Sequence, residues 1–393
     1  MTKKTREASI VLFLSVIMIF VSCGKQEAEW KGKVEEVNGV IIVRNPKQGL
    51  WDSKEKANVR IIKERQIGEL DGPEEFLFGY ISDVAVNRKG EIYVADRKLN
   101  EIRKFSKDGK HLLTIGRKGQ GPGEFQSVTI VSVNIHDDLI AFDNMLGRVS
   151  IFSDPGELKE TTKKLVAGSW IDASKIIFSE GKYVFFGKLS TSLKLFHEFG
   201  QDWSLKDSSI DYEFIDNQEF EEHSLGFNPG NCLFQDNGDI FYTKYYYDNR
   251  IFIYRNRELV KIISRDSDIK TPYEILVFHD VNKAVNLQRD HKYQEYDFRS
   301  FGQGIAYFGK SFQNSLGLYQ LSNGHVVNFL SLRKSKGIRE YGVELYDSEG
   351  KLLSYSKLGE NLYYNIRCMD SSGLFYAIER KEYDKVIMFR LEY

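Results

Sequence analysis

The stretch ISDVAVNRKGEIYVADRKLNEIRKFSKDGKHLLTIG, from Ile81 to Gly116, decides the fold of this chain. It predicts four short strands, rich in β-branched and aromatic residues and separated by turns that carry Gly, Asn or Asp. The predicted strands are DVAV, EIYVAD, EIRKFS and HLLTIG. Because four such strands in an antiparallel meander form one blade of a β-propeller, we expect an all-β fold.

The same pattern returns in weaker form along the rest of the chain. The further copies span Val133–Thr161, Lys175–Gly200, Asn231–Ile263, Ser315–Gly359 and Asn365–Tyr393. The last copy stops after three strands, and the alternating segment Ala57–Leu70 stands before the first copy with no blade of its own. We expect this segment to complete the last blade, since a closed ring leaves no free sheet edge to aggregate. The sequence therefore predicts a six-bladed β-propeller of four-stranded antiparallel blades over residues 57–393. A seventh blade would require a further copy near residues 264–304.

One region departs from the repeat and predicts a helical insertion. In Thr271–His291, Thr271 stands as a helix cap, Pro272 follows at the first helical position and Glu274 completes a capping box. A strand over Leu276–Phe278 is the alternative. A helix inserted between blades four and five would lie across one face of the ring. It would act there either as packing over a blade edge or as a lid over the central pocket.

The amino terminus predicts export and a lipid anchor. Three basic residues precede the apolar run Ala8–Val21, which is shorter than the roughly 20 residues that span a bilayer and fits a signal peptide. Ser22 followed by Cys23 resembles a bacterial lipobox, so we expect Cys23 to be lipidated. An ordinary signal peptide with a chance cysteine and an uncleaved anchor remain alternatives. Residues 1–22 are thus expected to form the signal peptide, and residues 23–56 a tether and N-terminal extension.

The residue after the lipobox bears on localisation. Gly24 follows Cys23, and this resembles sorting to the outer membrane. We therefore expect a protein of the bacterial cell envelope, anchored in the outer membrane by its lipid.

The charge balance of the chain argues against a nucleic-acid partner, and its cysteines are not expected to form a disulfide. The chain has 55 Lys and Arg against 56 Asp and Glu, a net charge of −1, whereas a nucleic-acid partner would need a strongly basic face. The expected partners are the membrane, through the lipid, and an unidentified protein or small-molecule ligand. Cys232 and Cys368 fall on innermost strands of separate blades. Since a disulfide needs Cα atoms within about 7 Å, we expect two buried free thiols.

The glycine-rich string TIGRKGQGPGEFQ, Thr114–Gln126, poses a choice between a phosphate loop and a crossing between blades. It lacks the Lys-Ser/Thr ending of a P-loop, and the residues that follow have strand character, so no helix N-terminus is offered to a phosphate. We predict a crossing from blade one to blade two, with Phe125 packed between the sheets. Arg117 and Lys118 would then stand on the rim of one face.

These residues also carry a family resemblance. The segment Ile81–Phe125 resembles an NHL-type repeat, and it is especially similar to the six-bladed β-propeller lipoproteins of Bacteroidetes-type bacteria. Asn38–Trp51 resembles segments that precede the propeller in such proteins. Since most members of this group have no established activity, the resemblance implies architecture rather than function.

No metal or catalytic motif is present in the sequence. The seven histidines are scattered and lack zinc-site spacing. A calcium lactonase site would need inward Glu, Asn and Asp side chains, and the loosely placed candidates are Asp83, Asn231, Asp236 and Asp370. Because no motif joins them, calcium is chemically compatible but is not predicted. No cofactor and no catalytic residue are assigned.

Basic, acidic and turn residues supply the remaining candidates. Arg148 and Arg250 occupy equivalent positions before the third strands of their blades, and with Arg117 and Lys118 they are candidates for one ligand-binding face. Solvated turn residues are the alternative. The acidic segment Asp207–His223 is expected to be a flexible loop, or else a site for a cation or a basic partner.

Two pairs of residues recur just after second strands: Asp96 with Asn100, and Asp248 with Asn249. We expect them to bond the backbone of their turns.

Two functions therefore stand before the structure. The first is a membrane-anchored, non-catalytic propeller that binds a protein or a small ligand through one face. The second is an envelope enzyme (a lyase, lactonase or hydrolase) with an axial site that works with or without a metal ion. Polar side chains that converge on the axis would favour the enzyme, and an apolar axis would favour the binding protein.

Overall fold

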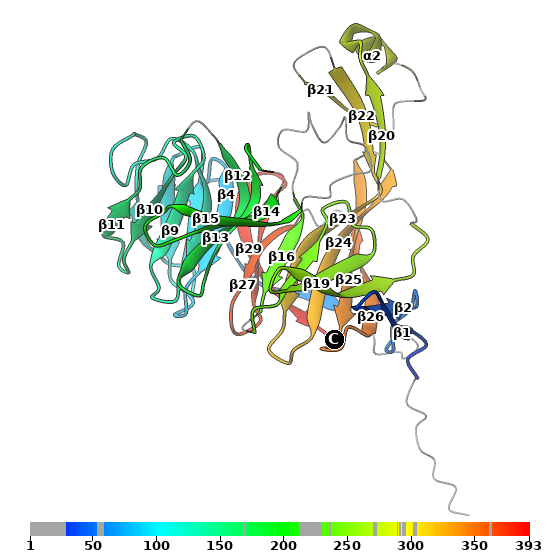
Figure 1. The fold of residues 1–393 in the computed structure, drawn as a ribbon. Helices are drawn as coiled ribbons and strands as arrows, with labels where there is room; N and C mark the ends of the chain where they lie inside the picture. Colours follow the sequence, from blue (N-terminus) through cyan, green and yellow to red (C-terminus); the bar gives the residue numbers. More distant parts are fainter. Residues whose placement is uncertain are drawn as a thin grey trace, which may run out of the picture.

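The computed structural model describes residues 29–393, apart from residues 53–58, 168–169, 193, 212–228, 236, 270–272, 289, 291, 293–295, 302–304, 336 and 361–363. The chain forms a ring of six β-sheets with a small insertion that projects from it (Figure 1). Cys23 and the predicted signal peptide lie outside the described residues. Within those described, no helix is long and apolar enough to cross a membrane.

Each blade is an antiparallel meander whose strands follow one another from the axis outward. Blade one consists of β4 (Ile81–Val86), β5 (Ile92–Asp96), β6 (Glu101–Phe105) and β7 (His111–Ile115). Blade two consists of β8 (Val128–Val133), β9 (Leu139–Asp143), β10 (Arg148–Phe152) and β11 (Leu158–Thr161). Blade three consists of β12 (Ile171–Ser179), β13 (Lys182–Leu189), β14 (Lys194–Phe199) and β15 (Leu205–Asp211).

The second half of the ring repeats this plan. Blade four contains β16 (Asn231–Phe234), β17 (Ile240–Thr243), β18 (Arg250–Arg255) and β19 (Glu258–Arg265). Blade five consists of β23 (Gln313–Gln320), β24 (Val326–Ser335), β25 (Ile338–Tyr346) and β26 (Leu352–Glu360). Blade six consists of β27 (Tyr364–Met369), β28 (Phe375–Arg380), β29 (Asp384–Glu392) and β3 (Arg60–Ile67).

The six-bladed prediction is confirmed, and two of its boundaries are corrected. The innermost strand of blade two is Val128–Val133, whereas the predicted copy began only at Val133. The outermost strand of blade three is Leu205–Asp211, so the first part of the predicted acidic loop is a strand. Both strands were missed because their polar residues (Thr129 and Ser132, or Lys206 and Asp207) weaken the apolar pattern.

The predicted closure is present. Strand β3 pairs antiparallel with β29, with Ile67 opposite Val386 and Arg60 opposite Glu392. The first described strand of the ring and the last strand of the chain therefore share one blade, and Ile67 is only 2% exposed within it.

Apolar side chains fill the space between every pair of neighbouring blades, in six separate clusters. Along β5, Ile92 and Val94 face blade six, while Tyr93 and Ala95 face blade two. Both faces of such a strand are buried, which explains why the middle strands are unbroken apolar runs in the sequence. Burial of these side chains between neighbouring blades is therefore the main contribution to the stability of the ring.

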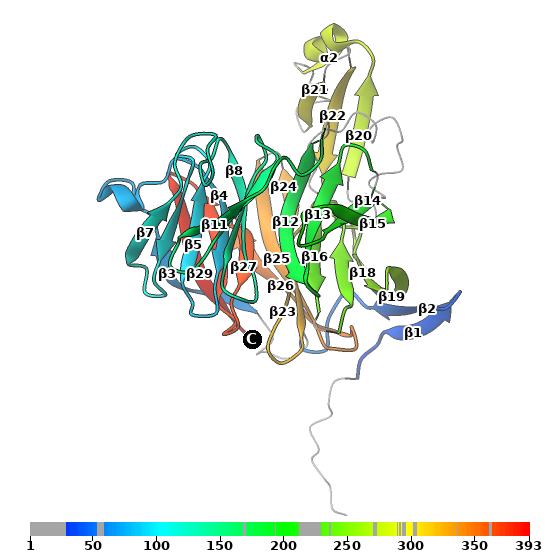
Figure 2. The same cartoon turned by 60° about the vertical axis from the view of Figure 1, so that its left-hand side comes forward.

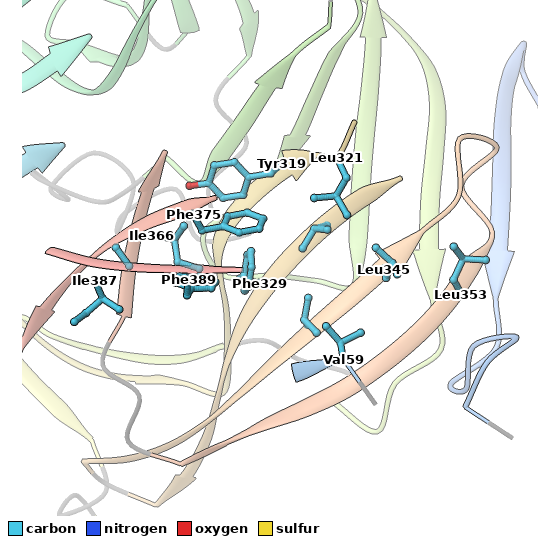
Figure 3. Close-up of a cluster of buried hydrophobic side chains, with 13 residues drawn as sticks. Val59, Tyr319, Leu321, Phe329, Leu345, Leu353, Ile366, Phe375, Ile387 and Phe389 are labelled. Carbon is cyan, nitrogen blue, oxygen red and sulfur yellow. The ribbon is translucent and has the colours of Figure 1, made fainter. Parts of the chain in front are cut away.

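The cluster between blades five and six is rich in aromatic rings (Figure 3). Phe375 stacks on Phe389 with ring centroids 5.2 Å apart, and Phe329 meets Phe375 edge-on at 5.2 Å. Tyr319 belongs to the same cluster, but Figure 3 shows its hydroxyl projecting away from the other apolar side chains.

The segment before the first blade ties three blades together. Strands β1 (Lys33–Val37) and β2 (Val40–Asn45) form a hairpin, and β2 extends blade four by pairing in parallel with β19. The amides of Leu50 and Trp51 then donate to carbonyls of β26 in blade five. Strand β3 follows in blade six, so the N-terminal segment crosses blades four, five and six in turn.

The insertion differs from the predicted helix. Its elements are β20 (Tyr273–Phe278), α2 (Val281–Leu287), β21 (Asp297–Phe301) and β22 (Ile305–Ser311). The helix begins after Asp280, whose carboxylate accepts a hydrogen bond from the Lys283 amide at 3.0 Å. The predicted capping box is wrong because Glu274 lies in a strand that pairs with β22; Thr271 and Pro272 lie outside the described residues.

The insertion has its own core, which includes Ala284, Ala306 and Phe308. Figures 1 and 2 show it projecting outward from the ring rather than lying across it. No seventh blade occurs among the described residues of 264–304, which instead form part of this three-stranded sheet and its helix.

The glycine-rich string is the crossing that the sequence predicts. Residues 116–127 lead from β7, the outermost strand of blade one, to β8, the innermost strand of blade two. Gly116 has φ +77°, and a Cβ atom there would lie 2.3 Å from the Phe125 ring. Phe125 is 1% exposed in the core between the two blades, and the absence of a side chain at Gly116 leaves room for its aromatic ring.

Recurrent aspartates hold the turns of the first two blades. The Asp96 carboxylate accepts hydrogen bonds from the amides of Gly79, Tyr80, Lys98 and Leu99. Asp143 accepts the equivalent four bonds in blade two from Gln126, Ser127, Met145 and Leu146. The structural role expected for Asp96 is thus confirmed. Asp248 differs, since its carboxylate accepts from Arg250.

Ring closure predicts a difference in stability between two isoleucines of β3. Ile67→Ala removes a side chain buried between blades six and one, so we expect it to lower the free energy of unfolding by about 2–4 kcal/mol. Ile62→Ala is the matched control, because Ile62 is 45% exposed and should cost less than about 0.5 kcal/mol. Denaturant unfolding of the two variants measures this difference. Equal losses would contradict the role of β3 in closing the ring.

Candidate functional site

A cavity of about 450 Å³ lies on the axis of the ring. The innermost strands of all six blades line it: β4, β8, β12, β16, β23 and β27. Its volume is within the range of small-molecule sites, roughly 300–1,000 Å³.

The cavity reaches one particular face of the ring. We call this the crossover face: it carries the connections between blades, such as residues 116–127 and 266–312, and the turns between second and third strands. Gly230 and Tyr245, in loops of this face, and Tyr364, at the start of β27, belong to the cavity lining. The other lining residues lie within strands, and they include Val86 and Val133, the last residues of β4 and β8, so the cavity also extends toward the opposite face.

Irregular backbone shapes the inner strands. The register with the second strand shifts in β4, β8, β12, β23 and β27. A bulge bends a strand and re-aims the side chain of the extra residue. In blade six the extra residue is Arg367, which lies between the paired residues Ile366 and Cys368. The bulge places this arginine among the residues that line the cavity.

Arg367 forms an ion pair with Asp83 of blade one. Its Nε donates to Asp83 Oδ1 at 2.7 Å. The same carboxylate accepts from the amides of Val84, at 2.9 Å, and Val131, at 3.0 Å. Asp83 is therefore held by three donors from blades one, two and six, and its charge is balanced. For the Nη atoms of Arg367, no hydrogen bond is recorded within the described residues, and the side chain is 21% exposed.

A second cation lies on the opposite wall. Lys175 of β12 lines the cavity and is partly exposed. Its Nζ donates to the Cys232 carbonyl at 3.5 Å, and within the described residues no carboxylate lies within ion-pair distance of it. With Asp83 and Arg367 balancing each other, the charged groups of the lining carry a net charge of +1 at neutral pH.

The two thiols line this same cavity. No disulfide joins Cys232 and Cys368, as predicted; Cys232 is buried as expected, whereas Cys368 is half-buried, and both line the cavity from separate blades. Burial raises the pKa of the Cys232 thiol to about 12 and also raises that of Cys368. Both therefore remain protonated at physiological pH. Burial likewise raises the pKa of Tyr319, whose hydroxyl has no recorded hydrogen bond within the described part of the chain.

A buried polar chain runs outward from the cavity wall. Asn231 Nδ2 donates to Ser315 Oγ at 3.0 Å, and Ser315 Oγ donates to Asn328 Oδ1 at 2.7 Å. Asn328 Nδ2 donates to Glu344 Oε2 at 3.0 Å, and Arg265 Nε donates to Glu344 Oε1 at 2.5 Å. Glu344 is fully buried, so the chain fixes the contact between blades four and five.

The four predicted face residues all belong to loops or strand starts at the crossover face, and they have different environments. Arg148 donates to the carbonyls of Gln120, Gly121 and Glu124, so it holds the glycine-rich crossing together. Arg117 pairs with Glu124 at 2.8 Å. Arg250 bonds Asp248 at 3.0 Å and lies over the Phe252 ring. Lys118 is exposed.

The calcium candidates are not brought together. Asp83 and Asn231 line the cavity, but Asp83 is engaged by Arg367. Asp370 bonds its own turn and the Tyr376 hydroxyl, and Asp236 lies outside the described residues. Within the part of the chain that the structure describes, no group of three or more His, Cys, Asp or Glu could hold a metal ion.

Only the first part of the predicted acidic loop lies within the described residues, and two of its aspartates form ion pairs there. Asp207 pairs with Arg257 and Asp211 pairs with Lys194 at 2.5 Å, on strand β15. The rest of the segment, residues 212–223, lies outside the described residues.

Comparison with known proteins agrees with this geometry. Residues 66–341, more than half of the chain, match the family described as 6-bladed beta-propeller. The chain belongs to this family. No curated protein matches it.

Solved propellers with similar folds have low sequence identity. A protein from Bacteroides fragilis, described as exported, is 13% identical with a TM-score of 0.54, over 89% of this chain and 99% of that one. A protein from Bacteroides vulgatus is 9% identical with a TM-score of 0.56, over 86% and 99%. A gluconolactonase from Xanthomonas campestris is 11% identical with a TM-score of 0.45, over 80% and 87%. Similarity at these identities shows the fold alone.

The buried thiols predict slow chemical modification. Because a thiolate is the reactive form, a pKa of about 12 makes Cys232 react at pH 8 about 1,000-fold more slowly than an exposed cysteine. In the Cys368→Ser variant of the chain that begins after Cys23, Cys232 is the remaining cysteine. We expect Ellman's reagent to modify it slowly in the folded protein, to react faster as the pH rises, and to react at once after unfolding. Rapid stoichiometric modification of the folded protein at pH 8 would contradict the burial of this thiol.

Proposed function

We propose that this propeller is a non-catalytic binding protein of the bacterial cell envelope, which holds a small ligand in its axial cavity. The observation that supports this most is the cavity itself: it is walled by all six blades, and its lining reaches the crossover face. Strands hold its side chains in place, and pre-organised sites lose little entropy on binding.

The axis is neither purely apolar nor arranged for catalysis. Polar groups do converge there, which favours the enzymatic alternative. However, the Asp83 carboxylate is engaged by three donors, so it is poorly suited to act as a general base. The thiols of Cys232 and Cys368 are poor nucleophiles, since burial raises the pKa of each. The groups present are better suited to hold a ligand than to transform it.

We further propose that acylated Cys23 anchors the protein in the outer membrane. Two or three acyl chains hold a protein stably on a membrane. The described chain begins close to the hairpin β1–β2, and in both views this hairpin lies away from the projecting insertion (Figures 1 and 2). Such an arrangement would direct the crossover face away from the anchoring membrane.

The crossover face supplies the rim of this site. Arg117 and Lys118 are exposed there, whereas Arg148 holds the loop between them and blade two. We propose that the ion-paired Arg117 and Arg250 and the loop-holding Arg148 shape this face, and that Lys118, which lies outside the cavity lining, does not contact the ligand.

Blocking the cavity tests this proposal. The soluble chain that begins after Cys23 keeps every described strand, and the neutral fluorophore N-phenyl-1-naphthylamine serves as the probe. We expect its emission to rise on binding to the unaltered protein. Ser132→Phe should lose this binding, because Ser132 lines the cavity. Thr114→Phe is the control, since Thr114 is exposed on the outermost strand of blade one.

Two outcomes would overturn the proposal. Equal binding by Ser132→Phe and the unaltered protein would place the probe elsewhere. Hydrolysis of a lactone that is lost in Ser132→Phe and kept in Thr114→Phe would establish the enzymatic alternative.

A further inference from the structure

We infer that the ligand of the axial cavity is a small organic carboxylate, whose single negative charge lies between Lys175 and Arg367. This inference rests on the proposed function and names its ligand class. The cavity lining holds two cations and one carboxylate, and that carboxylate is already paired.

Lys175 is the first part of the argument. Its ammonium group is in contact with a backbone carbonyl at 3.5 Å, a weak interaction, and no carboxylate within the described residues balances it. Lys175 lies on an inner strand and is partly exposed to the cavity, so its ammonium group is accessible to a bound ion. A bound anion would supply the missing partner.

Arg367 is the second part. Its Nε is committed to Asp83, which fixes the orientation of the planar guanidinium. The two Nη atoms have no recorded partner within the described chain, and they remain exposed to the cavity. A guanidinium that is anchored on one edge and open on the other presents a pre-organised fork to a carboxylate.

Tyr319 adds a neutral donor. The residue is only 8% exposed, and its hydroxyl belongs to the cavity lining without a recorded hydrogen bond in the described structure. Figure 3 shows the hydroxyl pointing away from the apolar cluster that holds the ring. Because the hydroxyl faces the cavity, it is placed to donate a hydrogen bond to a ligand oxygen.

The apolar part of the lining favours a ligand whose remaining atoms are apolar. Val86, Val133, Ile176 and Leu318 contribute aliphatic surface from four different blades. Because the net charge of the site is +1, a singly charged carboxylate with an apolar body matches it better than a doubly charged phosphate ester.

Titration with matched probes tests this inference. Straight-chain carboxylates from acetate to octanoate, and benzoate, are added to the protein saturated with N-phenyl-1-naphthylamine. We expect displacement by the longer carboxylates, with hexanoate bound at least about tenfold more tightly than 1-hexanol. Hexyl phosphate should bind more weakly than hexanoate.

Variants locate the charge. Lys175→Met should weaken hexanoate binding at least about tenfold while keeping the neutral fluorophore, since only the ammonium is lost. Lys175→Glu should abolish hexanoate binding and favour hexylamine instead. Lys118→Met is the matched control, because Lys118 lies on the same face but outside the cavity. Thermal unfolding checks that all three variants fold.

Each alternative result has a separate meaning. If the neutral fluorophore binds but no carboxylate displaces it, the anion inference fails and the proposed function stands. If Lys175→Met and Lys118→Met weaken hexanoate equally, the charge does not lie on the axis and the inference fails. Tighter binding of hexyl phosphate than of hexanoate would overturn the carboxylate class. If the fluorophore itself does not bind, the proposed function fails.

Discussion

The pairing of β3 with β29 is the constraint on which the rest of the structure depends. Every blade buries both of its faces against its neighbours, so a ring with a missing strand would expose an apolar face and an unpaired edge. Closing the circle with the first strand of the ring solves both problems. Blade six is complete only when the N-terminal strand β3 pairs with β29, so this blade depends on both ends of the ring.

The axial cavity follows from this closure. Six inner strands that surround an axis cannot all reach its centre, and the bulges in three of them, β12, β23 and β27, place their extra residues in the cavity lining. The side chains that meet there come from residues as distant in sequence as Asp83, Lys175 and Arg367. Their charges are therefore a property of the ring and not of any one blade, which makes the axis a place where binding specificity can change without altering the blades.

The interface between blades four and five is built differently from the others. The connection there is the long insertion, so it cannot hold the two blades in register as a short crossing does. The buried pair of Arg265 and Glu344 and the polar chain that leads to Asn231 supply that register instead. The N-terminal segment reinforces it, since the Asn45 side chain donates to the carbonyls of Ser264, in blade four, and Gly350, in blade five.

Sequence patterns determined the architecture of this protein, because a blade is a local object. Strand length, turn residues and the glycine-rich crossing are all encoded within about 40 residues, and the unpaired segment Ala57–Leu70 predicted closure. The same local rules misplaced the helix of the insertion. The residues around Glu274 resemble a helix cap, but they form a strand that pairs with β22. Pairing is decided by partners far along the chain, so a window of sequence does not contain it.

Such local patterns did not predict the residues of the candidate site. Asp83 and Asn231 were singled out only as loose calcium candidates, and Lys175 and Arg367 were not noticed, because a lone lysine and a lone arginine on polar-edged strands look like surface residues. Only the tertiary structure decided that these side chains share one cavity. The physical reason is that convergence on an axis depends on ring closure and on bulges that re-aim single residues, and neither leaves a motif in the sequence.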